Sequence, residues 1–168
     1  WMSDLHLGHI YRSGFCRRIT RRINRLNPDI IFIGGDLFDG ADGDLRNLIA
    51  PLRDLSAPLG VYFITGNHEE FTDRELFLKP IREIGSIRII INEAVDIDSL
   101  RIIGVDYRDT ANPQRYAQIL GGLVPADSRP SILLKHDPSN PRLAAELGVS
   151  LQISGHTHRG QLFPFNFM

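Results

Sequence analysis

Residues 30–36 read Ile-Ile-Phe-Ile-Gly-Gly-Asp, an apolar, mostly β-branched run that ends at two glycines and an aspartate. The same order recurs further along the chain, where short apolar runs are followed by an asparagine or a histidine. These later segments are residues 61–67, 132–136 and 151–156. Short apolar runs bounded by turn residues indicate buried strands, so each segment is predicted to be a strand that ends in a polar loop.

Helical patterns separate these predicted strands. Apolar residues recur at intervals of three and four within residues 15–26 and 45–55, as expected for the buried face of a helix. Further helices are predicted over residues 73–84, 113–120 and 141–147. Residues 87–105 contain short strand-like runs that predict hairpins, and therefore mixed sheets. Strands that alternate with helices indicate a layered α/β fold.

The size and composition of the chain suit one globular domain. The chain has 168 residues, of which 42% are hydrophobic and 23% charged, which excludes disordered, collagen-like and coiled-coil classes. The net charge of −1 argues against nucleic acid as a partner. The single cysteine, Cys16, excludes an intrachain disulfide and a cysteine-rich zinc site.

Both ends of the chain suggest a longer protein. Trp1 and Met2 lie directly before a polar motif, where a first strand should already have begun, and the chain ends at Met168 within an apolar run. We therefore expect residues 1–168 to form a single domain that is truncated at both ends. No stretch approaches the roughly 18 apolar residues of a membrane span, so any membrane anchor would lie outside these residues.

Five of the six histidines lie in compact polar clusters. In chain order the cluster residues are Asp4, His6, Asp36, Asn67, His68, Glu69, His136, His156 and His158. Taken singly, each cluster has an ordinary explanation, such as a turn or a structural histidine. Taken together they indicate a site, because neighbouring strands of one open sheet bring their carboxyl ends to a common crevice. Gly35, Gly66 and Gly155 would permit the close approach and unusual backbone angles that this convergence needs.

These side chains are of the types that bind metal ions. Imidazole and carboxylate ligands without thiolate suit manganese, iron or zinc. The candidate ligands outnumber those that one ion with open positions can use, so two divalent ions are predicted. Two ions about 3.5–4 Å apart need a bridging anion, for which Asp36 is suited, and they hold a hydroxide as nucleophile.

The motifs together resemble the signature of the calcineurin-like metallophosphoesterases. In chain order they are Ser3-Asp4-Leu5-His6, Gly35-Asp36-Leu37-Phe38-Asp39, Gly66-Asn67-His68-Glu69, His136 and Gly155-His156-Thr157-His158. The resemblance covers essentially the whole chain. It implies a four-layer sandwich, in which two mixed β-sheets are flanked by α-helices.

The resemblance also implies a role for each motif residue. One ion would be held by Asp4, His6 and His158. The second ion would be held by Asn67, His136 and His156. Asp36 would bridge the two ions. His68, oriented by Asp39, would lie beside the substrate phosphate with Asn67, and would stabilise the transition state or protonate the leaving oxygen.

The expected activity is therefore metal-dependent hydrolysis of a phosphomonoester or phosphodiester, with a nucleotide- or lipid-linked substrate among the alternatives. A nuclease of the same fold is a second interpretation, which the near-zero net charge disfavours. A non-catalytic scaffold that binds other proteins is a third, which the complete ligand set disfavours. The oligomeric state is not indicated by the sequence.

The ending of the chain resembles a bacterial subgroup of small, often membrane-associated phosphoesterases. That subgroup usually has glycine where this chain has Arg159. The Arg159 guanidinium would either bind a substrate phosphate or face solvent. The first predicted helix carries a row of arginines that is either a solvated face or a contact for anionic lipid or nucleic acid. Localisation therefore stays open between the cytoplasm and the periphery of a bacterial inner membrane.

Overall fold

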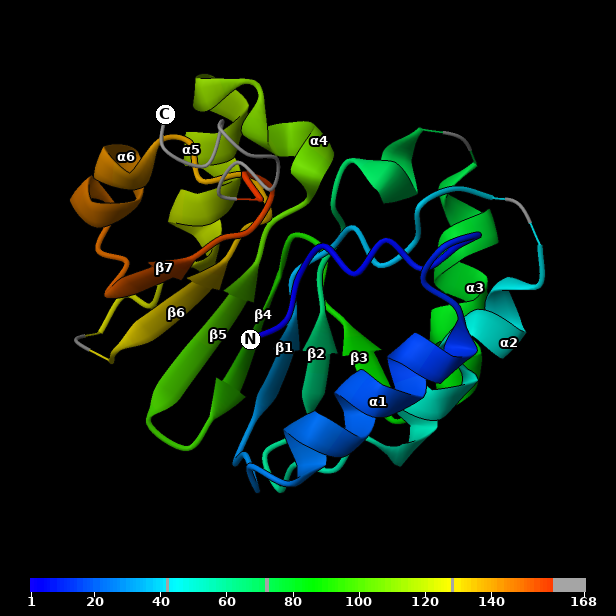
Figure 1. The fold of residues 1–168 in the computed structure, drawn as a ribbon. Coiled ribbons are helices and arrows are strands. Elements are labelled where there is room, and N and C mark those ends of the chain that lie inside the picture. The colour runs from blue at the N-terminus through cyan, green and yellow to red at the C-terminus, as the bar shows by residue number, and fades with distance from the viewer. Residues whose placement is uncertain (42, 72, 128, 159–168) are drawn as a thin grey trace.

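The computed structural model describes residues 1–158 except positions 42, 72 and 128. Two sheets pack face to face, and a group of helices covers the outer face of each sheet (Figure 1). The first sheet is parallel and contains, in spatial order, β1 (Ile31–Ile33), β2 (Val61–Phe63) and β3 (Ile87–Ile89). Met2 pairs with Ile33 in the parallel direction, so the N-terminal segment extends this sheet beyond β1.

Within the described residues, the second sheet has four strands. They are, in spatial order, β4 (Glu93–Ile97), β5 (Leu100–Gly104), β6 (Ser131–Leu134) and β7 (Leu151–Ile153). The first two strands form an antiparallel hairpin that turns at Asp98 and Ser99, whereas the other neighbours are parallel. The hairpin predicted within residues 87–105 is therefore confirmed, and the mixed strand directions lie in this sheet rather than in the first one.

Helices cover the outer face of each sheet (Figure 1). The first sheet is covered by α1 (Ser13–Asn24), α2 (Leu45–Ile49) and α3 (Arg74–Ile84). The second sheet is covered by α5 (Pro113–Leu123) and α6 (Pro141–Glu146). The sequence pattern did not predict the short helix α4 (Tyr107–Thr110). Asp106 caps its N-terminus, because the Asp106 side chain accepts the backbone N–H of Arg108. The expected four-layer sandwich is confirmed.

Three apolar layers separate these elements, because successive strand residues point to opposite faces. Phe32 contributes to the layer between the sheets, whereas its neighbours Ile31 and Ile33 pack under the first group of helices. In the second sheet, Ile102 faces the first sheet and Ile103 faces the helices α5 and α6. Each sheet is thus buried on both faces, which explains the nearly continuous apolar runs in the sequence.

The helix predicted over residues 45–55 is divided. α2 ends at Ile49 and continues as the 3₁₀ helix η1 (Ala50–Asp54). Pro51 lies at the start of η1, and a proline has no N–H with which to continue the α-helical hydrogen bonds. In the described part of the chain, none of the helices is long and apolar enough to cross a membrane.

Ile102 tests the packing between the two sheets. Its side chain is completely buried in the layer that joins the sheets. We expect Ile102→Ala to lower the free energy of unfolding by about 2–5 kcal/mol, because it leaves a cavity in that layer. Urea unfolding followed by circular dichroism measures this change. Leu76→Ala, at a position 46% exposed on α3, is the control and should change stability little; equal effects would contradict the assigned layer.

Candidate metal centre

The predicted metal ligands meet where the carboxyl ends of the strands of both sheets come together. Asp36 and Asn67 follow β1 and β2 of the first sheet, whereas His136 and His156 follow β6 and β7 of the second sheet. The site therefore lies across two sheets, and the prediction that one open sheet brings the ligands together was wrong. The crevice forms instead between two neighbouring sheets, because the carboxyl ends of their strands point in the same direction.

The N-terminal segment brings two further ligands to this edge. It runs parallel to the residues after β1, and the backbone N–H groups of Asp4 and His6 donate to the carbonyl oxygens of Gly35 and Asp36, at 3.1 Å each. The Asp4 carboxylate also accepts the backbone N–H of His156, at 3.2 Å to each oxygen. Hydrogen bonds thus fix the first motif of the chain against the last one.

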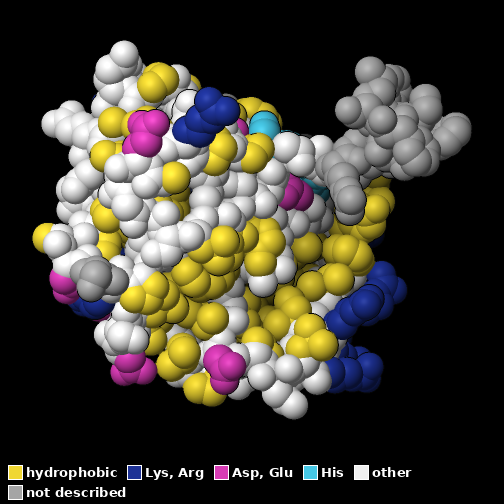
Figure 2. Space-filling model, turned by 90° about the vertical axis from the view of Figure 1, so that its left-hand side faces the viewer, with side chains coloured by type: hydrophobic (Ala, Val, Ile, Leu, Met, Phe, Trp, Pro, Cys, Tyr) yellow, Lys and Arg dark blue, Asp and Glu magenta, His cyan; other side chains and the backbone are white. Residues whose placement is uncertain are grey.

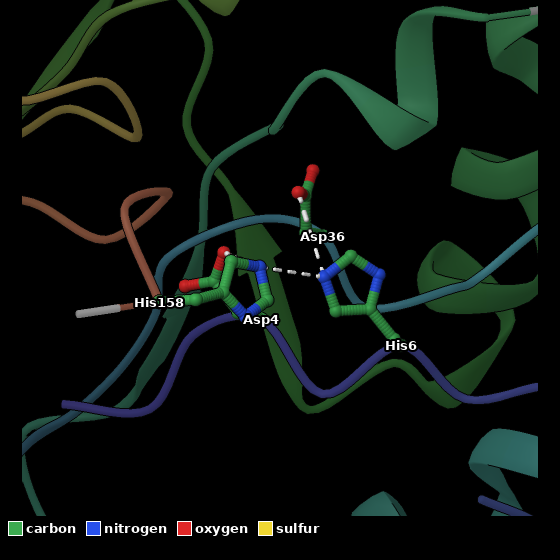
Figure 3. Close-up of side chains that lie close together, drawn as sticks. All are labelled: Asp4, His6, Asp36 and His158. Carbon is green, nitrogen blue, oxygen red and sulfur yellow. Dashed lines mark hydrogen bonds and ion pairs between the residues drawn. The ribbon is translucent and has the colours of Figure 1, made fainter. Parts of the chain in front are cut away.

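The first group of side chains consists of Asp4, His6, Asp36 and His158, whose ligand atoms lie within 4.8 Å of one another. Figure 3 shows the His6 ring facing both His158 and the Asp36 carboxylate. The distances are 3.1 Å between the Nε2 atoms of His6 and His158, and 3.8 Å from His6 Nε2 to Asp36 Oδ2. His158 Nε2 lies 3.3 Å from Asp4 Oδ1.

The second group consists of Asp36, His136 and His156. His136 Nε2 lies 3.2 Å from Asp36 Oδ2, from the Asn67 side-chain oxygen and from His156 Nδ1. His136 Nδ1 faces the carbonyl oxygen of Gly34 at 2.6 Å. A proton on Nδ1 donated to that carbonyl leaves Nε2 with a free lone pair directed into the group.

This donor set fits divalent metal ions. Ring nitrogens face each other at 3.1 Å between His6 and His158 and at 3.2 Å between His136 and His156, and each pair can share only one proton. A cation that accepts both lone pairs satisfies such a contact, and the adjacent carboxylates offset its charge. Both groups could therefore hold a metal ion, and Asp36 belongs to both of them.

His68 lies at the edge of the first group. Its ring makes an edge contact with the His6 ring at 4.4 Å between centroids. Asp39 lies beside His68, but it is the Asp39 backbone carbonyl, rather than its carboxylate, that faces His68 Nδ1 at 3.2 Å. The Asp39 carboxylate is 3.8 Å from His6 Nδ1. Arg159, the other predicted phosphate contact, lies outside the described residues.

The protonation of the ligands reflects burial and the central carboxylate. Burial lowers the pKa of His6, and the neighbouring His68 ring lowers it further. Burial alone would lower the pKa of His136, but the hydrogen bond and negative charge of Asp36 outweigh this effect and raise it. For the Asp36 carboxyl, burial acts in the opposite direction and raises the pKa. The hydrogen bond and charge of His136 outweigh burial, so the pKa of Asp36 is lowered overall. The buried Asp36 carboxylate is therefore stable as an anion.

Backbone strain is concentrated at the site. Among the described residues, nine residues other than glycine have positive φ angles, and five of them are predicted metal ligands. These five are Asp4, His6, Asp36, His156 and His158, with φ between 44° and 71°. Such residues persist only where the surrounding structure holds them, and they are frequent at functional sites. Positive φ angles therefore coincide with five of the seven predicted metal ligands.

Glycines allow the loops to approach one another closely. Gly35 has a φ of +85°, and a Cβ atom there would lie 2.3 Å from the backbone nitrogen of Gly66. At Gly66 a Cβ atom would lie 2.2 Å from Asp36 Oδ1, and at Gly155 it would lie 2.6 Å from Asp4 Oδ2. The predicted close approach is confirmed at all three positions, whereas a positive φ is found only at Gly35.

Glu69 is a structural part of the site to which the sequence analysis gave no role. Its carboxylate is completely buried and accepts three backbone N–H groups, from Asp36 and Leu37 at 2.9 Å and from Gly66 at 2.8 Å. Burial raises the pKa of Glu69, and these hydrogen bonds oppose the rise. A carboxylate between two ligand loops therefore fixes both Asp36 and Asn67. A charged residue directly after Gly66-Asn67-His68 was the signal available in the sequence.

Tyr107 borders the second group. Its ring lies 5.9 Å from the His136 ring and 6.0 Å from the His156 ring, between centroids. It belongs to α4, the short helix that follows β5. The aromatic ring therefore lies beside both imidazoles of the second group.

Glu69→Gln tests how the two ligand loops are held. The amide keeps the size of the side chain but places an NH₂ group where a carboxylate oxygen accepts a hydrogen bond. We expect the free energy of unfolding to fall by about 2–3 kcal/mol, because at least one buried N–H loses its acceptor. Urea unfolding measures this, and calorimetric titration with Mn²⁺ should show weaker binding. Glu146→Gln, at an exposed position, is the control; unchanged stability and metal binding in Glu69→Gln would refute the role.

This chain is similar in sequence to proteins that are described as metallophosphoesterases. An uncharacterized metallophosphoesterase of Campylobacter jejuni is 34% identical over 99% of this chain and 45% of its own length. A bovine transmembrane protein with a metallophosphoesterase domain is 35% identical over 98% of this chain and 41% of its own length. The chain thus spans less than half of either relative.

A solved crystal structure shares the fold, with a TM-score of 0.61 and 12% sequence identity, over 92% of this chain and 82% of that one. The family model described as calcineurin-like phosphoesterase matches residues 1–160, which include every predicted metal ligand. The two groups of histidines and carboxylates therefore lie within the matched domain, and the chain belongs to the calcineurin-like phosphoesterase family.

Proposed function

We propose that this domain hydrolyses phosphate esters with two divalent metal ions that share Asp36. The observation that supports this most strongly is the position of one atom, Asp36 Oδ2, which lies 3.8 Å from His6 Nε2 and 3.2 Å from His136 Nε2. One carboxylate thus faces both imidazole groups. Bridging carboxylates hold paired ions in hydrolytic enzymes, and the ligands suit manganese, zinc or iron.

The remaining ligands divide between the two ions. We assign Asp4, His6 and His158 to the first ion. We assign Asn67, His136 and His156 to the second ion. The short distances within each set support this division. Each ion would then share Asp36 and keep open positions for water and a substrate oxygen.

When bound, the ions supply positive charge that activates water and offsets the negative charge on the phosphoryl oxygens. The protein holds the ligands and positions the leaving group. The backbone N–H of His68 donates to Asp36 Oδ1 at 3.0 Å, which fixes His68 relative to the bridging carboxylate. A protonated His68 ring would donate Nδ1–H to the Asp39 carbonyl, so that Nε2–H could protonate the departing oxygen.

A groove beside the first group offers space for the organic part of the ester. It is lined by His6, His68 and Asp39 together with Ile10 and Tyr11. Ile10 is 83% exposed and Tyr11 is 47% exposed, so the groove has an apolar wall next to the ligands. The wall suits esters with an apolar or aromatic group, which includes lipid- and nucleotide-linked phosphates.

Asp36→Asn tests the bridging role. Loss of the negative charge should abolish binding of a second ion, and turnover should fall by at least about 100-fold because two-ion catalysis needs both. Metal content after dialysis and hydrolysis of bis(p-nitrophenyl) phosphate and p-nitrophenyl phosphate, in the presence of Mn²⁺ or Zn²⁺, measure the two effects. Asp29→Asn, at an exposed carboxylate on the loop before β1, is the matched control.

His68→Ala separates positioning of the leaving group from metal binding. We expect two ions to remain bound while turnover falls by about 100-fold or more, because general acid catalysis typically contributes that much. Wild-type protein that binds no metal, or an Asp36→Asn variant with full activity and two ions, would refute the proposed centre. Faster cleavage of single-stranded DNA than of either small ester would favour the nuclease interpretation.

The raised pKa of His136 gives a pH dependence of metal binding. A proton on His136 Nε2 competes with the ion, because only the free lone pair can act as a ligand. Affinity for Mn²⁺ should therefore fall as the pH is lowered from about 8 to about 5.5, across the histidine range. Calorimetry in buffers with different ionisation enthalpies should show proton release on binding. The same number of protons released by His136→Gln as by the wild type would contradict this explanation.

A further inference from the structure

The first helix carries a positively charged face that the metal centre does not use. Arg17, Arg18, Arg21, Arg22 and Arg25 are all exposed and line one groove along α1. At 100° per residue these five positions fall within about 140° of the helix circumference. We call these five residues the basic face of α1.

The basic face has no acidic partner among the described residues. α1 contains no aspartate or glutamate, and none of its arginines forms an ion pair with a described residue. Several arginines elsewhere do form ion pairs, for example Arg46 with Glu83 and Arg101 with Asp96. The positive charge is therefore local, since the whole chain has a net charge of −1.

The arrangement of these arginines does not favour the helix itself. Arg17 and Arg21, Arg18 and Arg22, and Arg21 and Arg25 are four residues apart, and like charges at this spacing destabilise a helix. The three arginines at the end of α1 are partly offset by the helix dipole, but Arg17 and Arg18 lie too far from that end. An anionic partner would compensate the repulsion along the whole row.

Exposed apolar residues lie next to the basic face. Leu26 is 75% exposed and Trp1 is 43% exposed, and both line a groove with Arg22, Ile19 and Ile23. Figure 2 shows basic side chains at the lower right edge of the molecule, beside a broad hydrophobic area. A surface with arginines and an adjacent leucine and tryptophan matches the interface between lipid head groups and acyl chains.

We propose that the basic face of α1 docks this domain onto an anionic lipid surface. The arginines would bind the lipid phosphates, and Leu26 and Trp1 would enter the interfacial region. A nucleic acid would also attract the arginines, but an exposed leucine gains nothing from a phosphate backbone. The lipid surface is therefore the partner that accounts for both the charge and the apolar residues.

The groove beside α1 gives this docking a consequence for the metal centre. The groove that contains Arg22 and Leu26 extends to Asp4 and His158, two residues of the first ligand group. A domain docked through α1 would thus hold its ligand groups near the lipid surface. The docking itself depends only on α1 and its neighbours, so it can hold or fail independently of the proposed hydrolysis.

Vesicle flotation without added metal tests the proposal. The whole chain is mixed with phosphatidylcholine vesicles that contain either no anionic lipid or about 30% phosphatidylglycerol, at low salt. We expect binding to the anionic vesicles only, with Arg18→Gln/Arg22→Gln binding about 30-fold more weakly, from roughly fivefold per arginine. Arg53→Gln/Arg142→Gln removes the same charge at two other exposed arginines and should bind as the wild type does.

Leu26→Ser separates lipid from nucleic acid as the partner. We expect this variant to bind anionic vesicles several-fold more weakly, because an exposed leucine no longer enters the interface. Thermal unfolding should show no loss of stability in any variant, since all substituted side chains are exposed. The proposal would be overturned if the wild-type protein did not bind anionic vesicles, or if both arginine double variants lost the same vesicle affinity. Binding to duplex DNA in place of vesicles would also overturn it.

Discussion

The buried carboxylate of Glu69 is the interaction on which the centre depends. It accepts backbone N–H groups from the loop after β1 and from the loop after β2, so two strands end in one fixed geometry. Without such an acceptor, three buried N–H groups would lack a partner at the position where Asp36 must be held. The strained φ angle of Asp36 persists because Glu69 accepts the backbone N–H groups of Asp36 and of the next residue, Leu37.

The positions of most strands and helices along the chain could be predicted because they follow from apolar periodicity. The run from Ile30 to Ile33 indicates a strand because it is β-branched and is followed by two glycines, and the three- and four-residue spacing within residues 15–26 indicates a helix. The break of the helix at Pro51 and the four-residue helix after Asp106 depend on local hydrogen bonds that periodicity does not report. Boundaries of short elements were therefore the weaker part of the prediction.

The sequence predicted which residues form the candidate site better than it predicted how they are arranged. Histidine and aspartate directly after the strands identified the residues, but the sequence did not show that they belong to two different sheets. Two contacts within the site could not be predicted because they depend on the folded structure. The contact of His68 with a backbone carbonyl of Asp39, rather than with its carboxylate, depends on loop geometry, and the role of Glu69 depends on complete burial.

The distance along the chain between the ligands has a consequence for synthesis. His6 and His158 face each other although 152 positions separate them, and Asp4 accepts the N–H of His156 over the same separation. A ribosome must therefore release almost the whole domain before Asp4, His6, Asp36 and His158 can come together. Under the proposed function, neither group of side chains that would hold an ion is complete in a nascent chain, so the choice among competing cellular metals would be made only after the two sheets have packed.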